Sequence, residues 1–453
     1  MTDYEILRSE HTRQAVALTP DHQERITWSA QRLQQEREQR LRALIRVAKE
    51  RSSWHRERLA HIDADALSFA DLPSIPPMSK SEMMANLDGV FTDPRLTRRL
   101  VEGHLDSLED DRYLLDEFHV VASGGSSGTR GVFVYDWDGW LQCRLGLLRF
   151  SVRHQQRHFP AGARAVVGWI AASKATHMTF AMGRTFGGSG DVVSIPATLP
   201  LNDIVARLND LQPDILAGYP TMLYPLAAEA RAGRLRISPR LLRPGSEPLL
   251  PEIRSAIIDT WQCPVINVYG TSEGASASSC GESPGMHLND DMVIYEPVDE
   301  QGAPVAPGQR AAKLYITNLF NYAQPLIRYE LTDETVAVGE ACPCGSALQR
   351  IDDIHGRADD VFRYGSGVVV HPLTFRSELG HDPSILEYQV KQQPRGATIG
   401  IRTSGPVDTT SLMQRLSAAL DRAGVAGATV SVEIVDGFDR QQTGKLKRFI
   451  PLD

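Results

Sequence analysis

The stretch VVASGGSSGTRGVFVY, at residues 120–135, is the most specific signature in this chain. Glycines, hydroxyl side chains and one arginine stand between two apolar runs, a pattern that predicts a tight loop joining two strands. Glycine lets the backbone approach a phosphate closely, and the hydroxyls of Ser126, Ser127 and Thr129 can donate hydrogen bonds to phosphate oxygens. The stretch therefore predicts a polyphosphate site, with a flexible Ser/Gly turn as the alternative.

Three further motifs follow this loop in a fixed order along the chain. They are YGTSE at residues 269–273, GRAD at 356–359 and TGK at 443–445. The first offers an aromatic face and a carboxylate, and the last brings an ammonium group from a distant part of the sequence. Each motif is weak by itself, but together they predict an ATP site.

In this order the motifs resemble those of the adenylate-forming superfamily of acyl-CoA synthetases and adenylation domains. The resemblance covers nearly the whole chain and is closest to the phenylacetate–CoA ligase-like branch. It also includes LP at residues 72–73, MSK at 78–80, GSEP at 245–248 and CPCG at 342–345. The CPCG segment points to that branch.

The resemblance implies an α/β fold with two domains. A large N-terminal domain, residues 1–355, would bind ATP and the acyl group, and its first 75 residues would be helical. A small, mobile C-terminal α/β domain, residues 356–453, would carry the catalytic lysine. Asp359 would be the hinge between them, and the alternative is that Asp359 only caps a turn.

The residue pattern supports the same architecture. Strand-like apolar runs at residues 165–170, 265–269 and 313–317 alternate with helix-like segments, which favours an α/β fold. Residues 21–62 carry Leu33, Leu41, Leu44 and Ile45 at helical spacing and predict one long amphipathic helix with a solvated Arg/Glu face. After residue 357, apolar runs around a helical stretch at 409–423 predict a compact unit of about a hundred residues.

By resemblance, the nucleotide is bound by residues from four segments. The ring of Tyr269 would stack on adenine, Asp333 would accept hydrogen bonds from the ribose hydroxyls, and Glu273 would hold Mg²⁺ against the phosphates. The family often has lysine after the last glycine of the loop, where this chain has Val132, so we expect Arg130 to supply the positive charge. The complete set is Ser126, Ser127, Gly128, Thr129, Arg130, Gly131, Gly245, Ser246, Glu247, Pro248, Tyr269, Gly270, Thr271, Ser272 and Asp333.

Lys445, Glu273 and Arg357 are the expected catalytic residues. When a carboxylate attacks the α-phosphate, negative charge builds on the phosphoryl oxygens, and a positioned ammonium stabilises that state more than the ground state. A surface lysine is the alternative for Lys445, but the residues around it match the family pattern.

Three of the five cysteines and one histidine have the spacing of a metal site. Cys280, His287, Cys342 and Cys344 could converge as a tetrahedral Cys₃His zinc site, a pattern that also resembles the phenylacetate–CoA ligase branch. The alternative is separate buried thiols and a surface histidine. Four protein ligands leave no open position, so we expect any zinc here to be structural.

The sequence specifies the acyl pocket less clearly than the other sites. By position, Trp169, His177, Met178 and Tyr219 are expected to contact the substrate, together with Phe180. His177 could instead be a satisfied core histidine. Lys174 could pair with a second acidic group on the substrate or simply be exposed to solvent.

Composition limits the location and the partners. The formal charge of −8 argues against a nucleic-acid surface, and no apolar run is long enough for a membrane span. The acidic start of the sequence has no apolar signal region, which predicts a cytoplasmic protein. Relatives of this kind are often dimers, and the sequence leaves a homodimer open.

Three functions are consistent with these motifs. The first is an AMP-forming acid–thiol ligase that uses ATP, Mg²⁺ and CoA on an aryl or arylacetic acid. The second keeps the adenylation but passes the acyl group to an amine, a carrier protein or another nucleophile. The third is a non-catalytic nucleotide-binding relative, which the presence of Lys445, Glu273 and Asp333 argues against.

Overall fold

The computed structural model describes residues 3–123, 131–160, 162, 164–172, 174–186, 192–357, 361–365, 367–370, 372–379, 382, 384–440 and 446–452. For Arg357 the described part is the backbone, at the end of β15 (Arg350–Arg357). Among the described residues, no helix is both long and apolar enough to cross a membrane. Predicted site residues outside these ranges are Ser126, Ser127, Gly128, Thr129, Arg130, Asp359 and Lys445.

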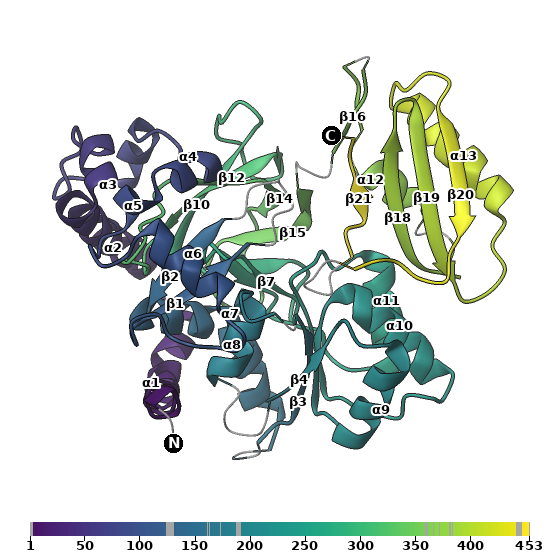
Figure 1. The fold of residues 1–453 in the computed structure, drawn as a ribbon, viewed down its shortest axis with the longest axis horizontal. Helices are drawn as coiled ribbons and strands as arrows, with labels where there is room; N and C mark the ends of the chain where they lie inside the picture. Colours follow the sequence, from purple (N-terminus) through teal and green to yellow (C-terminus); the bar gives the residue numbers. More distant parts are fainter. Residues whose placement is uncertain are drawn as a thin grey trace.

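Parallel and antiparallel sheets with covering helices confirm the predicted α/β class. Figure 1 shows the N-terminal helices at one end of the molecule and a small unit containing β18–β20 at the other. The site described below lies where the central sheets meet the chain that leads into that unit.

The chain begins with three helices where the sequence pattern predicts one over residues 21–62, and that prediction is wrong. The side chain of Ser29 accepts a hydrogen bond from the backbone N–H of Arg32, and that of Ser52 accepts one from the N–H of His55. Each serine caps the start of a new helix, so the chain turns there. The helices are α1 (Asp3–Arg25), α2 (Ala30–Arg51) and α3 (Ser53–Arg58).

The predicted apolar stripe of this region is confirmed. Leu41, Leu44 and Ile45 are fully buried against the residues that follow α3, and Leu33 is buried in a separate small cluster. The next helical segments are η1 (Phe69–Ser74), a 3₁₀ helix, α4 (Lys80–Ala85), α5 (Leu87–Val90) and α6 (Arg98–Asp106).

The first hairpin flanks the predicted phosphate loop. Its strands β1 (Phe118–Ala122) and β2 (Val132–Asp136) pair antiparallel, which confirms the predicted arrangement on both sides of the loop. Ser123 N donates to Gly131 O at 2.9 Å, and Gly131 N donates to Ser123 Oγ at 2.9 Å. These two bonds hold the ends of the loop together.

A long helix, α7 (Trp137–His158), follows the hairpin and packs against α1 and against β2 and β8. The carboxylate of Asp136 accepts a hydrogen bond from Gly139 N at 2.8 Å and so caps the helix. One side of α7 packs against α1, and Leu147 packs against the parallel sheet.

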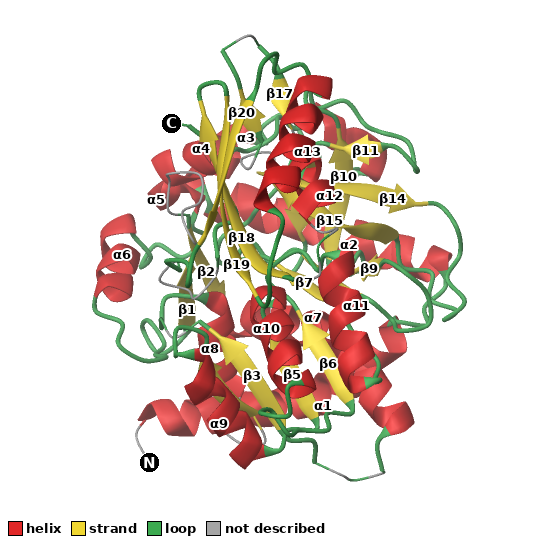
Figure 2. Cartoon of the chain, turned by 90° about the vertical axis from the view of Figure 1, so that its right-hand side faces the viewer, coloured by secondary structure: helices red, strands yellow, loops and turns green. Residues whose placement is uncertain are grey.

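The parallel sheet has the strand order β4-β3-β5-β6. One face packs against α9, α10 and α11, and the other faces α7, as Figure 2 shows around β3, β5 and β6. Its strands are β3 (Val167–Ala171), β4 (Val192–Pro196), β5 (Ile215–Gly218) and β6 (Leu241–Pro244). Its helices are α8 (Met178–Phe186), α9 (Leu201–Leu211), α10 (Pro220–Arg231) and α11 (Pro251–Trp261).

Two antiparallel sheets complete the large part of the molecule. The six-stranded sheet has the order β11-β14-β15-β9-β8-β7, and the three-stranded sheet has the order β10-β12-β13. The remaining strands of these sheets are β7 (Val268–Gly270), β8 (Ser276–Ser278), β9 (Met286–Leu288), β10 (Val293–Val298), β11 (Arg310–Ala311), β12 (Lys313–Asn318), β13 (Tyr329–Leu331) and β14 (Asp333–Val338).

The small unit has its own hydrophobic core, formed entirely by residues 362–449. Its main sheet has the order β20-β19-β18-β21, and α12 and α13 cover one face. Its elements are β16 (Phe362–Arg363), β17 (Val369–Val370), α12 (Leu373–Leu379), β18 (Ile385–Gln393), β19 (Gly396–Thr403), α13 (Thr409–Arg422), β20 (Thr429–Ile434) and β21 (Phe449–Ile450).

Candidate active site

A cavity of about 530 Å³ lies between the parallel sheet, the six-stranded sheet and the segment that leads to β21. It brings together segments that are far apart in the sequence. The predicted residues that line it are Trp169, His177, Met178, Tyr219, Gly245, Ser246, Glu247, Pro248, Tyr269, Gly270, Thr271, Ser272, Glu273 and Asp333.

The GSEP segment forms one wall, directly after β6. Gly245 packs so closely on β7 that a Cβ atom there would lie 2.6 Å from Val268 O, so a larger residue would push the wall away. Ser246 has a positive φ of 65°, which turns the chain toward the cavity. Glu247 accepts a hydrogen bond from Thr221 N at 3.2 Å through Oε2, whereas its buried Oε1 has no partner among the described residues.

Tyr269 and Asp333 meet at the nucleotide end predicted by resemblance. The Tyr269 hydroxyl donates to Asp333 Oδ2 at 2.8 Å, which fixes the carboxylate beside the ring. Asp333 is buried and Tyr269 is half-buried, so the ring and the carboxylate border the same space. The pair therefore suits a group that combines a flat ring with hydroxyls.

Two side-chain hydrogen bonds fix the backbone of the turn at residues 271–274. Asn318 Nδ2 donates to Glu273 O at 2.9 Å, and the Tyr135 hydroxyl donates to Ser272 O at 2.6 Å. Gly274 has a φ of +91°, and a Cβ atom there would lie 2.3 Å from Asn318 Nδ2, so only glycine fits. This support fixes the backbone that carries Glu273.

The side-chain hydroxyl of Thr271 is a further polar group at the cavity. Its Oγ1 is buried without a hydrogen-bond partner among the described residues, although the side chain lines the cavity. A buried hydroxyl without a partner costs about 1–3 kcal/mol, so a ligand that accepts its proton would recover that cost. Thr271 and Glu247 thus each present an unsatisfied polar atom at this site.

The segment directly after Lys445 borders the same cavity. Leu446, Lys447, Arg448 and Phe449 all line it, together with Gly356 of β15. Phe449 also lies in the core of the small unit, which anchors the segment. Lys445 itself lies outside the described residues.

The predicted acyl residues gather at the β3–α8 end of the cavity. Trp169 packs over α8, where a Cβ atom on Gly183 would lie 2.9 Å from the Trp169 ring, and Tyr219 is buried at the start of α10. Burial raises the pKa of the Tyr219 hydroxyl, so it is present in its neutral form. Phe180 and Lys174 do not line the cavity, and Lys174 is exposed.

Three further residues at this end of the cavity were not predicted from the sequence. Arg144 and Leu147 project from α7 and Arg243 from β6, and all three line the cavity. The available signal was a charged residue inside an otherwise apolar element, as in LLRP at residues 241–244.

The four predicted metal ligands come together outside the cavity. Their ligand atoms all lie within 4.8 Å of one another. Cys280 Sγ lies 3.6 Å from Cys342 Sγ, and Cys344 Sγ lies 3.4 Å from His287 Nε2. Hydrogen bonding to Cys344 lowers the pKa of Cys280 well below its usual range, which suits a thiolate ligand. The alternative of unrelated thiols and a surface histidine is wrong, since His287 is buried and the four residues form one cluster.

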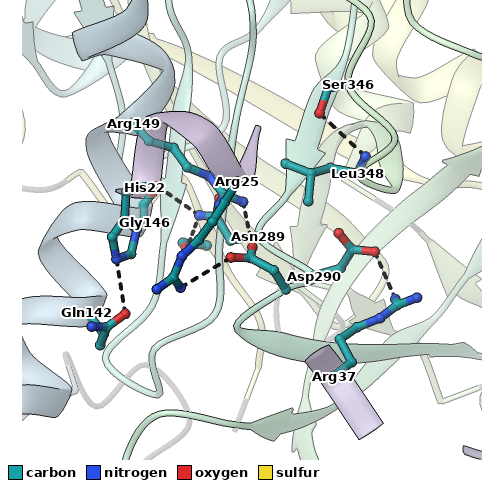
Figure 3. A network of polar contacts seen from close by, with 12 residues as sticks. His22, Arg25, Arg37, Gln142, Gly146, Arg149, Asn289, Asp290, Ser346 and Leu348 are labelled. Atoms are coloured by element: carbon teal, nitrogen blue, oxygen red, sulfur yellow. Dashed lines mark hydrogen bonds and ion pairs between the residues drawn. The ribbon is translucent and has the colours of Figure 1, made fainter. Parts of the chain in front are cut away.

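A buried ionic network joins the N-terminal helices to the layer that carries the metal-ligand cluster (Figure 3). Arg149 Nη2 donates to Asp291 Oδ1 at 2.8 Å, and Arg25 Nη1 lies 3.6 Å from Asp291 Oδ2. Arg37 Nη1 donates to Asp290 Oδ2 at 2.9 Å. Arg25 and Arg37 are therefore ion-paired and largely buried, which corrects the prediction that the arginines of this region form only a solvated face.

The network has a defined protonation state. Although burial raises it, the pKa of Asp291 falls to about 2 because Arg149 and Arg25 lie beside it. Burial raises the pKa of Asp290 to about 6, and burial lowers the pKa of His22 to about 3. His22 is thus neutral at pH 7, and its Nε2 lies 3.0 Å from Gln142 Oε1.

Comparison with known proteins finds phenylacetate–coenzyme A ligases among the relatives of this chain. No family model matches the chain. The chain is 25% identical over 432 residues to a phenylacetate–coenzyme A ligase of Thermus thermophilus, and the match covers 91% of this chain and 88% of that ligase. It is 25% identical over 418 residues to a phenylacetate–coenzyme A ligase of Pseudomonas putida, with 86% and 84% covered.

The fold is shared with a solved CoA ligase. The structure of 2-hydroxyisobutyryl-CoA ligase in the postadenylation state, in complex with R3-HIB-AMP, superposes with a TM-score of 0.70 at 18% identity. The match covers 95% of this chain and 91% of that ligase.

Proposed function

We propose that this chain, which matches phenylacetate–coenzyme A ligases over nearly its whole length, is an AMP-forming acid–CoA ligase of the adenylate-forming superfamily. The observation that carries this proposal is the convergence of the GSEP wall, the YGTSE turn and the segment after Lys445 on one cavity. The related ligases are named for phenylacetate, so we propose an aryl or arylacetic acid as the substrate class.

The first half-reaction joins the acid to AMP. A carboxylate oxygen of the acid attacks the α-phosphorus of ATP, a new P–O bond forms, and the bond to pyrophosphate breaks. Tyr269 and Asp333 hold adenosine, and the Thr271 hydroxyl donates to an oxygen that develops negative charge. Lys445 stabilises the same charge, and this proposed role is supported by the position of its neighbours Leu446–Phe449 at the cavity wall.

The second half-reaction transfers the acyl group. The CoA thiolate attacks the carbonyl carbon of the acyl-adenylate, the thioester forms, and AMP leaves with the bonding electrons. An amine or a carrier-protein thiol in place of CoA is the second candidate, and dependence of product formation on free CoA separates the two. We place the hinge for the change between half-reactions at Asp359, next to the separate core of residues 362–449.

Two places in the structure have side chains that suit a metal ion. The carboxylate of Glu273 is a hard oxygen ligand on a rigidly held turn at the cavity, so it suits Mg²⁺, which would neutralise phosphate charge. The cluster of Cys280, His287, Cys342 and Cys344 suits Zn²⁺, and its four ligands are complete without substrate. A cytoplasmic location and a homodimer stay predictions from the sequence.

Pyrophosphate release tests the proposed function. Purified protein is mixed with ATP, Mg²⁺ and a panel of aryl, arylacetic, fatty and amino acids, each with and without CoA. We expect acid-dependent pyrophosphate release and a CoA thioester of the same acid. Release without thioester would favour the amine or carrier-protein alternative, and ATP binding without release for any acid would contradict the proposal.

A further inference from the structure

Two arginines line the acyl end of the cavity without a carboxylate partner among the described residues. Arg144 lies on α7, and its guanidinium carbon is 5.3 Å from the centre of the Phe186 ring of α8. Arg243 is the third residue of β6, in an otherwise apolar strand. Neither guanidinium forms a hydrogen bond or an ion pair with a described residue. This contrasts with Arg149 and Arg328, whose buried guanidiniums reach Asp291 and Glu296.

The two arginines approach the same space. Arg243 lies opposite Ala217, and Ala217 lies opposite Trp169, so the three residues form one row across β6, β5 and β3. Side chains alternate along a strand, which places Arg243 on the same face as Leu241, the face that packs against α7. Arg144 precedes Leu147 by one helical turn on α7, and Leu147 packs against that face.

Both arginines are half-buried at the cavity wall, where loss of water contact disfavours their charged forms. Burial and the neighbouring charge of Arg243 lower the pKa of Arg144 to about 9, and burial lowers that of Arg243 to about 10. Burying a charge without a partner is expensive, so proteins usually pair buried arginines with carboxylates. Two such groups that face a cavity can be paired by an anion that enters it.

We propose that the acid activated by this protein carries a second carboxylate, which Arg144 and Arg243 bind at the acyl end of the cavity. The proposal rests on the proposed ligase function and narrows its substrate class to dicarboxylic acids. A fork-shaped guanidinium matches a carboxylate geometrically, and two of them neutralise the charge that burial penalises. Lys174, the sequence-based candidate for this role, is exposed and does not line the cavity.

The reacting carboxylate is a poor match for the same two arginines. It must attack phosphorus with a free lone pair, and two charge-assisted hydrogen bonds would withdraw that electron density. The apolar body between the two carboxylates would contact Trp169, Met178 and Met182, which line the cavity beside the arginines. The arginines therefore suit the group that does not react.

Matched acids test the proposal by activity. Phenylacetate is compared with 4-carboxyphenylacetate, and hexanoate with adipate, as substrates for pyrophosphate release. We expect the dicarboxylic acid to be preferred in at least one pair. Arg144→Met and Arg243→Met should each lower kcat/KM for that acid at least about thirtyfold more than they lower kcat/KM for the neutral acid. Arg207→Met, at an exposed position of α9, is the matched control and should change neither value.

Binding provides a readout that does not depend on turnover. Two acyl-sulfamoyladenosines, which differ only in a terminal carboxylate or its methyl ester, are titrated by calorimetry into wild type and both variants. We expect the free carboxylate to bind more tightly to wild type and to lose that advantage in each variant. Thermal unfolding without ligand should show that neither methionine variant is less stable than wild type, because each removes a half-buried positive charge that has no anionic partner among the described residues.

The outcomes separate the inference from the proposed function. Pyrophosphate release with neutral acids alone, or equal binding of the two analogues, would overturn the dicarboxylic substrate and leave the ligase intact. Failure of both analogues and of all acids would overturn both. A marked loss of stability in Arg144→Met or Arg243→Met would show a structural role for the arginine and would also contradict the inference.

Discussion

Under the proposed function, Lys445 is the single residue on which we expect the adenylation chemistry to depend most. Lys445→Ala should lower the rate of pyrophosphate release at least about a hundredfold, roughly 2.7 kcal/mol of barrier, because the ammonium acts on charge that exists only in the transition state. ATP binding, measured by calorimetry, should persist, since the proposed adenosine contacts of Tyr269 and Asp333 do not involve that ammonium.

An exposed lysine of the same unit provides the control for this variant. Lys391 lies on β18 with its side chain exposed, and Lys391→Ala should leave the rate unchanged. Near-normal acid-dependent pyrophosphate release by Lys445→Ala would mean that another cation stabilises the transition state.

Single residues could be predicted from the sequence where a motif gathers them. Gly245, Thr271 and Glu273 stand in short segments whose spacing is set by one turn of the backbone, and the structure places all three on the cavity. Arg144 and Arg243 belong to two elements that meet only after the parallel sheet has packed on α7. No local pattern connects them, so these two arginines of the acyl end could not be predicted in the same way.

At the scale of elements, two turns hold the metal-ligand cluster together. Cys280 and His287 flank the turn between β8 and β9, and Cys342 and Cys344 lie in the turn between β14 and β15. A metal ion would cross-link these turns at one end of the strands of the sheet that also carries Tyr269.

We expect about one zinc per chain in freshly reduced protein, measured by metal analysis. Cys342→Ser should reduce the zinc content and lower the thermal unfolding temperature, because the cross-link between the two turns is lost. Cys263→Ser, at a thiol outside the cluster, should retain the metal. Metal-free wild type with unchanged unfolding would show that the four side chains pack together without an ion.

The error in the N-terminal elements has a physical reason. Helical spacing continues through residues 21–62, so periodicity alone does not show where the helices end. Ser29 and Ser52 each cap a helix, and capping depends on a local turn that periodicity does not report. The burial of Arg25 and Arg37 depends on Asp290 and Asp291, more than 250 residues further along the chain.

At the scale of the whole molecule, buried neutral histidines make stability depend on pH. Burial lowers the pKa of His55 to about 3, and its Nε2 lies 3.0 Å from Pro325 O. Between pH 3 and 6.5 the unfolded chain binds the proton and the folded chain does not, so the free energy of unfolding falls as pH falls. We expect a loss of about 2 kcal/mol from His55 between pH 7 and pH 5.

Chemical denaturation of wild type and His55→Gln at both pH values checks this expectation. The glutamine amide can still donate to Pro325 O but does not titrate, so the loss of unfolding free energy should be smaller by about that amount. Asp290, whose pKa is raised, acts in the opposite direction and is common to both proteins. Exposed His61→Gln is the control, and an equal loss in wild type and His55→Gln would contradict the assignment.

The last strand along the chain has a consequence for synthesis on the ribosome. β21 pairs in parallel with β18, and Phe449 fills the aromatic core beside Phe362, Phe375 and Tyr388. Until residue 450 has left the exit tunnel, β18 is an unpaired sheet edge and that core has a vacant place. The growing chain can thus fold the other walls of the cavity well before residues 446–450 are anchored, so under the proposed function we expect a nascent chain to hold ATP before it is able to consume it.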